Sequence, residues 1–140
     1  MRLQRSARPL AIGYPIQALF VPFPCVCFFL ALLTDLAFWS TSNLMWQNFS
    51  AWLLLVGLLF GGLSIPAALI DLFRPSTRLL RAGVMSSITF VAAMALAFVN
   101  SLVHAGDGWT AVVPYGLLLS AVTVAFILFS ILLNARARRL

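Results

Sequence analysis

Four long apolar segments constrain this chain more than any other feature of its sequence. They run approximately over residues 15–39, 49–73, 82–104 and 110–134. A helix needs about 20 apolar residues to cross the hydrocarbon core of a bilayer, and each segment is long enough. Charged residues make up only 9% of the chain, against about 25% in a typical soluble domain. The sequence therefore predicts an all-α integral membrane protein, with residues 1–140 forming a single transmembrane domain.

The positions of the charged residues predict how the segments are oriented. All nine cationic side chains are arginines, and they lie in three clusters at the amino terminus, the middle connection and the carboxyl terminus: Arg2, Arg5 and Arg8; Arg74, Arg78 and Arg81; Arg136, Arg138 and Arg139. The connections 39–48 and 104–109 contain no Lys or Arg. The positive-inside rule then places both termini and the middle connection in the cytoplasm, where these arginines are expected to contact lipid headgroups. Short connections make consecutive helices antiparallel neighbours, so we expect an up-down four-helix bundle.

The net charge of +6 raises the possibility of a nucleic-acid-binding protein, but the arrangement of the charges does not fit one. A nucleic-acid-binding face spreads its basic residues along a helix or groove, whereas these arginines sit at the ends of apolar runs. The four tryptophans, Trp39, Trp46, Trp52 and Trp109, fall near the opposite ends of the segments, as in an interfacial aromatic belt. We therefore expect lipid contact and no nucleic acid.

Small residues at helical spacing predict which faces of the helices pack together. Helices in lipid associate through close packing of small side chains and through interhelical hydrogen bonds. The residues expected in the bundle interior on this basis include Gly57, Gly61, Ser64, Ala93, Ala97, Gly116 and Ser120. The Gly57-x-x-x-Gly61 pair could instead form the contact between two copies of the chain.

The candidate site consists of ionisable and polar residues in the second half of the first segment and at the end of the third. Asp35, Asn100 and His104 lie at a similar expected depth, and burying such groups in a membrane is costly. They are predicted to form a polar intramembrane cluster. The functional interpretation is a proton relay or a polar ligand site; the structural one is a set of buried contacts that fix helix register, or an Asp solvated at the interface. Asp71, at the end of the second segment, is expected to pair with Arg74 and Arg78.

Enzyme and metal-site motifs are absent from the sequence. There is no Glu, one His and three scattered Asp, so neither a catalytic triad nor the usual metal sites can be assembled. Glycine loops for phosphate binding are also missing. We therefore predict a protein that is not an enzyme, without a metal or cofactor. Haem held by His104 and a Met is an alternative, since one chain supplies a single His.

The segments YPIQALFVPFPCVCFFLALLTDLAFW (14–39) and FSAWLLLVGLLFGGLSIPAALIDLF (49–73), with VNSLVHAGDGW (99–109), resemble family 2231 of the domains of unknown function. The resemblance implies a bacterial inner-membrane protein with about four spans and a possible accessory role beside redox proteins. This chain departs from the family pattern, with Gln17 and the stretch 84–87 where relatives often carry His. If those histidines bind a cofactor in relatives, the resemblance implies that this chain has lost it.

Three functions follow from these observations. The first is a non-catalytic accessory or structural subunit of a larger membrane complex, with a membrane-protein partner or a homo-oligomer; the family resemblance points to a redox complex. The second is a small proton-coupled transporter or ion pathway that uses Asp35. The third is a haem-binding membrane redox protein. The first is our prediction, and the other two remain as alternatives.

Overall fold

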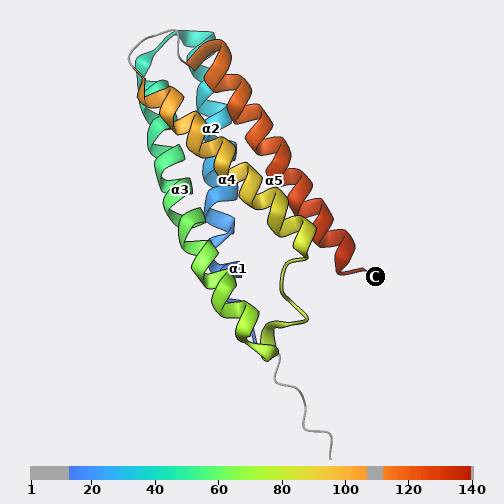
Figure 1. The fold of residues 1–140 in the computed structure, drawn as a ribbon. Coiled ribbons are helices and arrows are strands. Elements are labelled where there is room, and N and C mark those ends of the chain that lie inside the picture. The colour runs from blue at the N-terminus through green and yellow to red at the C-terminus, as the bar shows by residue number, and fades with distance from the viewer. Residues whose placement is uncertain (1–12, 107–111, 140) are drawn as a thin grey trace, which may run out of the picture.

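The computed structural model describes residues 13–106 and 112–139, and Figure 1 shows them as one elongated helical bundle. Its elements are α1 (Gln17–Phe20), α2 (Pro22–Thr41), α3 (Leu44–Phe73), the 3-10 turn η1 (Pro75–Thr77), α4 (Val84–Ala105), the kinked turn η2 (Val112–Gly116), whose Val113 has non-helical backbone angles, and α5 (Leu117–Ala137). Four helical stretches are long and apolar enough to cross a membrane: Gln17–Thr41, Leu44–Phe73, Val84–Ala105 and Val112–Ala137. The prediction of an all-α bundle with four membrane spans is confirmed.

Two local sequence features set the limits of the first two spans. Helix α3 begins at Leu44, earlier than expected, because the Asn43 side chain accepts a hydrogen bond from the backbone N–H of Met45 at 3.0 Å. Such a cap satisfies one of the unpaired donors at the start of a helix. The first span is interrupted at Val21, between α1 and α2. Pro22 follows immediately, and a proline has no N–H with which to continue the hydrogen-bond ladder.

Most of the buried residues of each long helix repeat at alternating steps of three and four, which is the spacing of left-handed helix bundles. The repeats are Pro24, Phe28, Ala31, Asp35 and Phe38 in α2; Ser50, Leu54, Gly57, Gly61 and Ser64 in α3; Ser86, Phe90, Ala93, Ala97, Asn100 and His104 in α4; and Gly116, Ser120, Thr123, Ile127 and Ser130 across η2 and α5. The middle of the bundle is an apolar core. Polar members of the repeats lie nearer to the two ends.

We call the two ends of the bundle the arginine end and the tryptophan end. At the arginine end, the backbone N–H of Gly13 donates to the carbonyl of Ser76 at 3.0 Å, and a guanidinium N–H of Arg138 donates to the carbonyl of Leu80 at 3.4 Å. The segment before the first span, the middle connection and the end of α5 therefore meet on one side of the bundle. Arg2, Arg5 and Arg8 lie outside the described residues.

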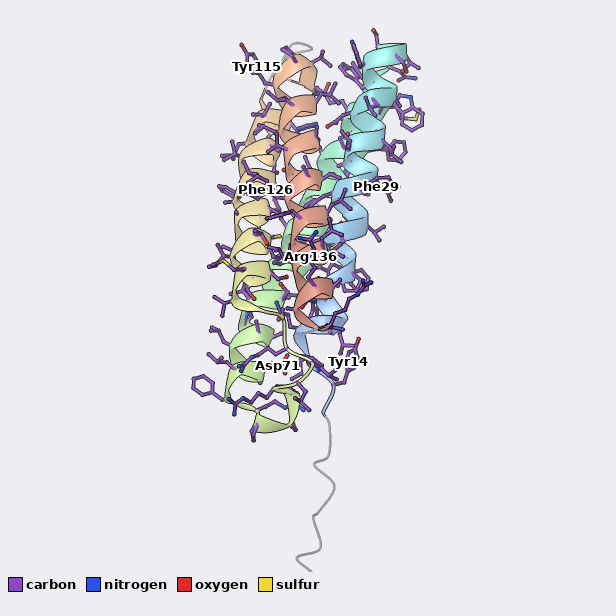
Figure 2. All side chains as sticks on the ribbon, turned by 90° about the vertical axis from the view of Figure 1, so that its right-hand side faces the viewer. Tyr14, Phe29, Asp71, Tyr115, Phe126 and Arg136 are labelled. Atoms are coloured by element: carbon purple, nitrogen blue, oxygen red, sulfur yellow. The ribbon has the colours of Figure 1, made fainter. Side chains whose placement is uncertain are left out.

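The tryptophan end holds the turn between α2 and α3. Trp39 is 63% exposed and Trp52 is 65% exposed, as side chains at a membrane interface would be. Trp109 lies outside the described residues. Figure 2 places Tyr14 and Tyr115 at opposite ends of the bundle and shows Phe29 and Phe126 pointing outward between them. The outer surface between the two ends is built from large apolar side chains, which suits a surface in contact with lipid.

Candidate functional site

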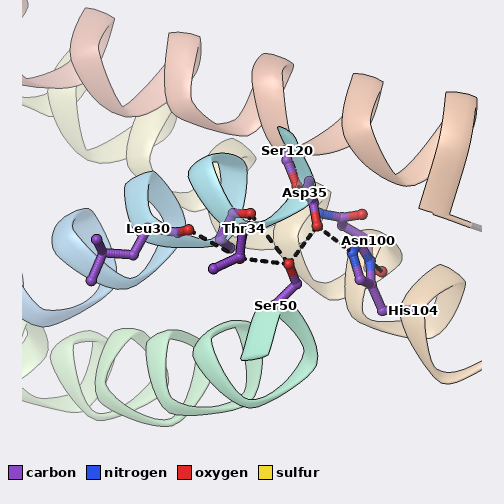
Figure 3. Close-up of polar contacts among 8 residues, drawn as sticks. Leu30, Thr34, Asp35, Ser50, Asn100, His104 and Ser120 are labelled. Carbon is purple, nitrogen blue, oxygen red and sulfur yellow. Dashed lines mark hydrogen bonds and ion pairs between the residues drawn. The ribbon is translucent and has the colours of Figure 1, made fainter. Parts of the chain in front are cut away.

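Asp35 is the centre of a buried polar network at the tryptophan end, and it joins α2 to the other three long helices (Figure 3). The residue is fully buried. Its Oδ1 accepts a hydrogen bond from the Ser50 hydroxyl of α3 at 2.5 Å and lies 2.9 Å from Nε2 of His104 on α4. Its Oδ2 accepts from the Ser120 hydroxyl of α5 at 2.5 Å. The structure therefore gives this carboxyl group three partners from three helices.

His104 is the member of the network whose protonation the geometry constrains. Its Nδ1 lies 3.0 Å from the backbone carbonyl oxygen of Asn100. A carbonyl oxygen only accepts hydrogen bonds, so Nδ1 must carry a hydrogen. Nε2 then either carries a second proton and faces a carboxylate, or accepts a proton from a protonated Asp35. In both cases a single proton lies between Asp35 and His104, and the pair has no net charge.

Asn100 joins the network through Ser120. The Asn100 amide Nδ2 donates to the Ser120 hydroxyl at 2.7 Å, and this hydroxyl donates in turn to Asp35. The structure thus brings together the three residues predicted to form the polar intramembrane cluster. The Asn100 side-chain oxygen is buried without a hydrogen-bond partner among the described residues.

Sequence reasoning missed Thr34 and Ser50 and placed Ser120 among the packing residues only. The Thr34 and Ser50 hydroxyl oxygens lie 2.6 Å apart, and the Thr34 hydroxyl also approaches the carbonyl of Ala31 at 2.9 Å. A signal for Ser50 was present, because Ser50, Gly57, Ser64 and Asp71 recur every seven residues. Ser50 therefore continues the buried face of the second span, on which the prediction began only at Gly57.

The residues predicted for helix packing are all buried. They are Gly57, Gly61, Ser64, Ala93, Ala97, Gly116 and Ser120. A Cβ added at Gly57 would lie 2.4 Å from the ring of Phe28, and one at Gly61 would lie 2.3 Å from the end of the Met94 side chain. Both glycines therefore allow close contacts inside the bundle. The Gly57-x-x-x-Gly61 pair is occupied by these contacts, which weighs against its use between two copies.

Asp71 has a role at the arginine end that the sequence showed only in part. It is fully buried, and its Oδ1 pairs with Arg74 at 3.1 Å. Among the described residues Arg74 is the cation that pairs with it, and Arg78 does not. Its Oδ2 accepts from the backbone N–H of Gln17 at 2.9 Å. A carboxylate at a helix amino terminus satisfies a free N–H and interacts favourably with the helix dipole, so Asp71 ties the end of α3 to the start of α1.

The contacts of His104 do not suit a haem ligand. Both ring nitrogens are occupied by hydrogen bonds, so ligation to iron would require His104 to leave Asp35 or Asn100. In residues 13–106 and 112–139 there is also no group of three or more His, Cys, Asp or Glu side chains placed to hold a metal ion. What the network can do chemically is hold a proton between two groups and link four helices.

The comparison with protein families gives one match that covers most of the chain. The family described as predicted membrane protein (DUF2231) matches residues 13–137. The searches of the curated proteins and of the solved structures found no match. The matched range includes every long helix and the whole Asp35 network. The chain belongs to the DUF2231 family of membrane proteins.

Proposed function

We propose that this protein is a non-catalytic subunit of a larger complex in a bacterial inner membrane, with both termini in the cytoplasm. The observation that carries the proposal is the enclosure of Asp35 and His104. Asp35 is fully buried, His104 is 5% exposed, and each is already engaged by the other. Groups that act on a substrate need a route to it, whereas groups that fix a fold are most useful when they are saturated by one another.

The network has the properties expected of a device that fixes helix register. It contacts all four long helices, and its bonds have mutually compatible directions, from Asn100 to Ser120 to Asp35 and from Ser50 to Asp35. A polar residue in a helix interface can specify one alignment of the helices. A bundle fixed in this way presents a constant lateral surface of large apolar side chains, and a constant surface is what a membrane-protein partner needs.

The test is purification of the tagged full chain from its native membranes in a mild detergent, followed by quantitative mass spectrometry and an absorption spectrum of the same eluate. We expect a stoichiometric membrane-protein partner and a featureless Soret region. The matched variants are Asp35→Asn, which should retain the partner, and Asp35→Leu, which should lose it because the bundle no longer holds its alignment. Recovery of the chain as a lone monomer from native membranes would refute the subunit role, and a Soret band would refute the absence of haem.

One observation favours a second candidate, a proton-coupled pathway. Asp35 and His104 lie 2.9 Å apart and share a proton that either can hold, and such pairs occur in proton relays. The test uses purified protein in proteoliposomes with a pH-sensitive dye inside. Loss of a proton flux in the Asp35→Asn variant, with normal folding, would support this function. A flux unchanged by the substitution, or no flux in the unmodified protein, would remove it.

A further inference from the structure

A cavity of about 200 Å³ opens at the arginine end between the first span, the start of α4 and the end of α5. Neither the Asp35 network nor the proposed subunit role uses it. We propose that it binds an anionic phospholipid from the leaflet at the arginine end, with the headgroup at Arg138 and part of an acyl chain inside the cavity. The argument depends on the cavity's size, its apolar wall, its unpaired polar atoms and its charged rim.

The size and the wall of the cavity suit a hydrocarbon chain. An apolar cavity of about 150 Å³ is already large enough to bind a small apolar molecule such as benzene, and this one is larger. Its wall includes the apolar side chains of Val21, Phe90, Ile127 and Ile131. Because the helices around it are surrounded by lipid, acyl chains are the most abundant apolar molecules that can enter from the side.

The polar groups of the cavity lie on the side nearer to the membrane surface. The Ser86 and Ser130 hydroxyls satisfy each other at 3.1 Å, so they need no ligand. The side-chain oxygen of Asn134 is different, because it is buried without a partner among the described residues. Ala18 also lines the cavity, and its carbonyl cannot receive the usual helical hydrogen bond, since residue 22 is a proline without an N–H. The polar side of the cavity therefore contains two carbonyl groups that lack a donor among the described residues.

The rim of the cavity carries the charge that an anionic headgroup requires. Arg138 lines the cavity and is exposed. Its single described hydrogen bond, to the carbonyl of Leu80, is long at 3.4 Å, which leaves most of the five guanidinium N–H donors available. Basic pockets between membrane helices are recognised sites for anionic lipid headgroups. An anionic phospholipid matches both the cation at the rim and the apolar wall of the cavity.

The experiment is native mass spectrometry of the full chain after incubation with an equimolar mixture of phosphatidylglycerol and phosphatidylcholine in mild detergent. We expect one phosphatidylglycerol to be retained in preference to phosphatidylcholine. Arg138→Gln should lower that retention about fivefold, the effect of one basic side chain near an anionic headgroup. Arg136→Gln is the matched control, since Arg136 lies two residues away in sequence but does not line the cavity, and it should change retention little.

A cavity-filling variant separates the site from general attraction to the arginine end. Ser87 lines the cavity, and among the described residues its hydroxyl bonds to the carbonyl of Gly83, the N-cap of α4. Ser87→Phe should abolish phosphatidylglycerol retention, and a thermal melt in the same detergent shows whether the variant is folded. The proposal would be overturned by equal losses of retention in Arg136→Gln and Arg138→Gln, or by phosphatidylglycerol retention in a folded Ser87→Phe variant. It would also be overturned if the unmodified protein retained the two lipids equally or retained no lipid.

Discussion

Replacing Asp35 separates the two properties that the buried network has, its contribution to stability and its shared proton. Asp35→Leu removes one partner from each of three hydrogen bonds, to three different helices. The Ser50 and Ser120 hydroxyls keep other partners, Thr34 and Asn100. Each of these two losses should therefore cost about 0.6 kcal/mol, the average for interhelical hydrogen bonds in a membrane protein.

The larger cost comes from His104. Its Nε2 faces Asp35 in a site from which solvent is excluded, and a buried polar group left without its partner costs about 1–3 kcal/mol. We therefore expect Asp35→Leu to lower the free energy of unfolding by about 2–4 kcal/mol in total. In contrast, Asp35→Asn should cost less than about 1.5 kcal/mol, a cost typical of a volume-conserving substitution. Its amide can donate to Nε2 of His104 and still accept from Ser120, with Nδ1 of His104 unchanged.

The assay is reversible unfolding in mixed micelles, followed by circular dichroism and tryptophan fluorescence. The variants are Asp35→Leu, Asp35→Asn, His104→Leu and the double variant that combines Asp35→Leu with His104→Leu. Removing both partners leaves no unpaired group, so the double variant should be more stable than the two single losses predict together. A loss below about 1 kcal/mol for Asp35→Leu would show that the network contributes little. Two results would refute a neutral, hydrogen-bonded Asp35–His104 pair. One is an equal loss of stability in Asp35→Leu and Asp35→Asn; the other is a loss in the double variant equal to the sum of the two single losses.

The other predictions concern packing, the Asp71 contacts and orientation. Gly57→Ala should destabilise the bundle by about 1–3 kcal/mol because the new Cβ meets the Phe28 ring, whereas Gly62→Ala, with nothing within 4 Å, should be neutral or stabilising in the same unfolding assay. Asp71→Ala leaves the Gln17 N–H without its acceptor and should cost about 1–3 kcal/mol of stability. Asp71→Asn keeps an acceptor oxygen and should cost less. Equal losses in the two variants would contradict the role of Asp71 as the acceptor for the Gln17 N–H. In a chain with Cys25 and Cys27 replaced, a cysteine at position 78 should react with a membrane-impermeant maleimide only from the cytoplasmic side and one at position 43 only from the other side. The reverse pattern would refute the proposed orientation.

The fold followed from the sequence because the constraints of the bilayer are simple. A span needs about 20 apolar residues whatever its partners are, so hydropathy alone located four helices. Small and polar residues indicate which face of a helix is buried. Leu and Phe are equally stable in lipid and in the bundle interior, so they give little information about helix orientation. The buried position of Phe28 shows the limit of this reasoning. Its ring fills the space left by Gly57, and only the alignment of α2 against α3 decides that it points inward while Phe29 points out.

The candidate site was predictable in its members but not in its connections. Asp35, Asn100 and His104 could be grouped because each lies near the same end of its span. Which atom bonds to which depends on the rotation of each helix, and no spacing within one span fixes that rotation relative to another. Gln17 illustrates the same point at the arginine end. Its backbone N–H makes the contact with Asp71, and a backbone group leaves no signal in the sequence.

The apolar core separates the Asp35 network from the cavity at the arginine end, and this separation bears on the proposed function. On α2, Asp35 lies ten residues from Cys25, the nearest cavity residue of that helix, and on α4 Asn100 lies ten residues from Phe90. Ten helical residues span about 15 Å, and this length is filled by core residues that include Phe28, Leu54 and Met94. A proton leaving the Asp35–His104 pair toward the arginine end would have to cross this apolar layer, which has few groups able to carry it. A transport function would require the core to open, whereas a structural role needs it to stay closed, and the tight contacts of Gly57 with Phe28 and of Gly61 with Met94 favour a core that stays closed.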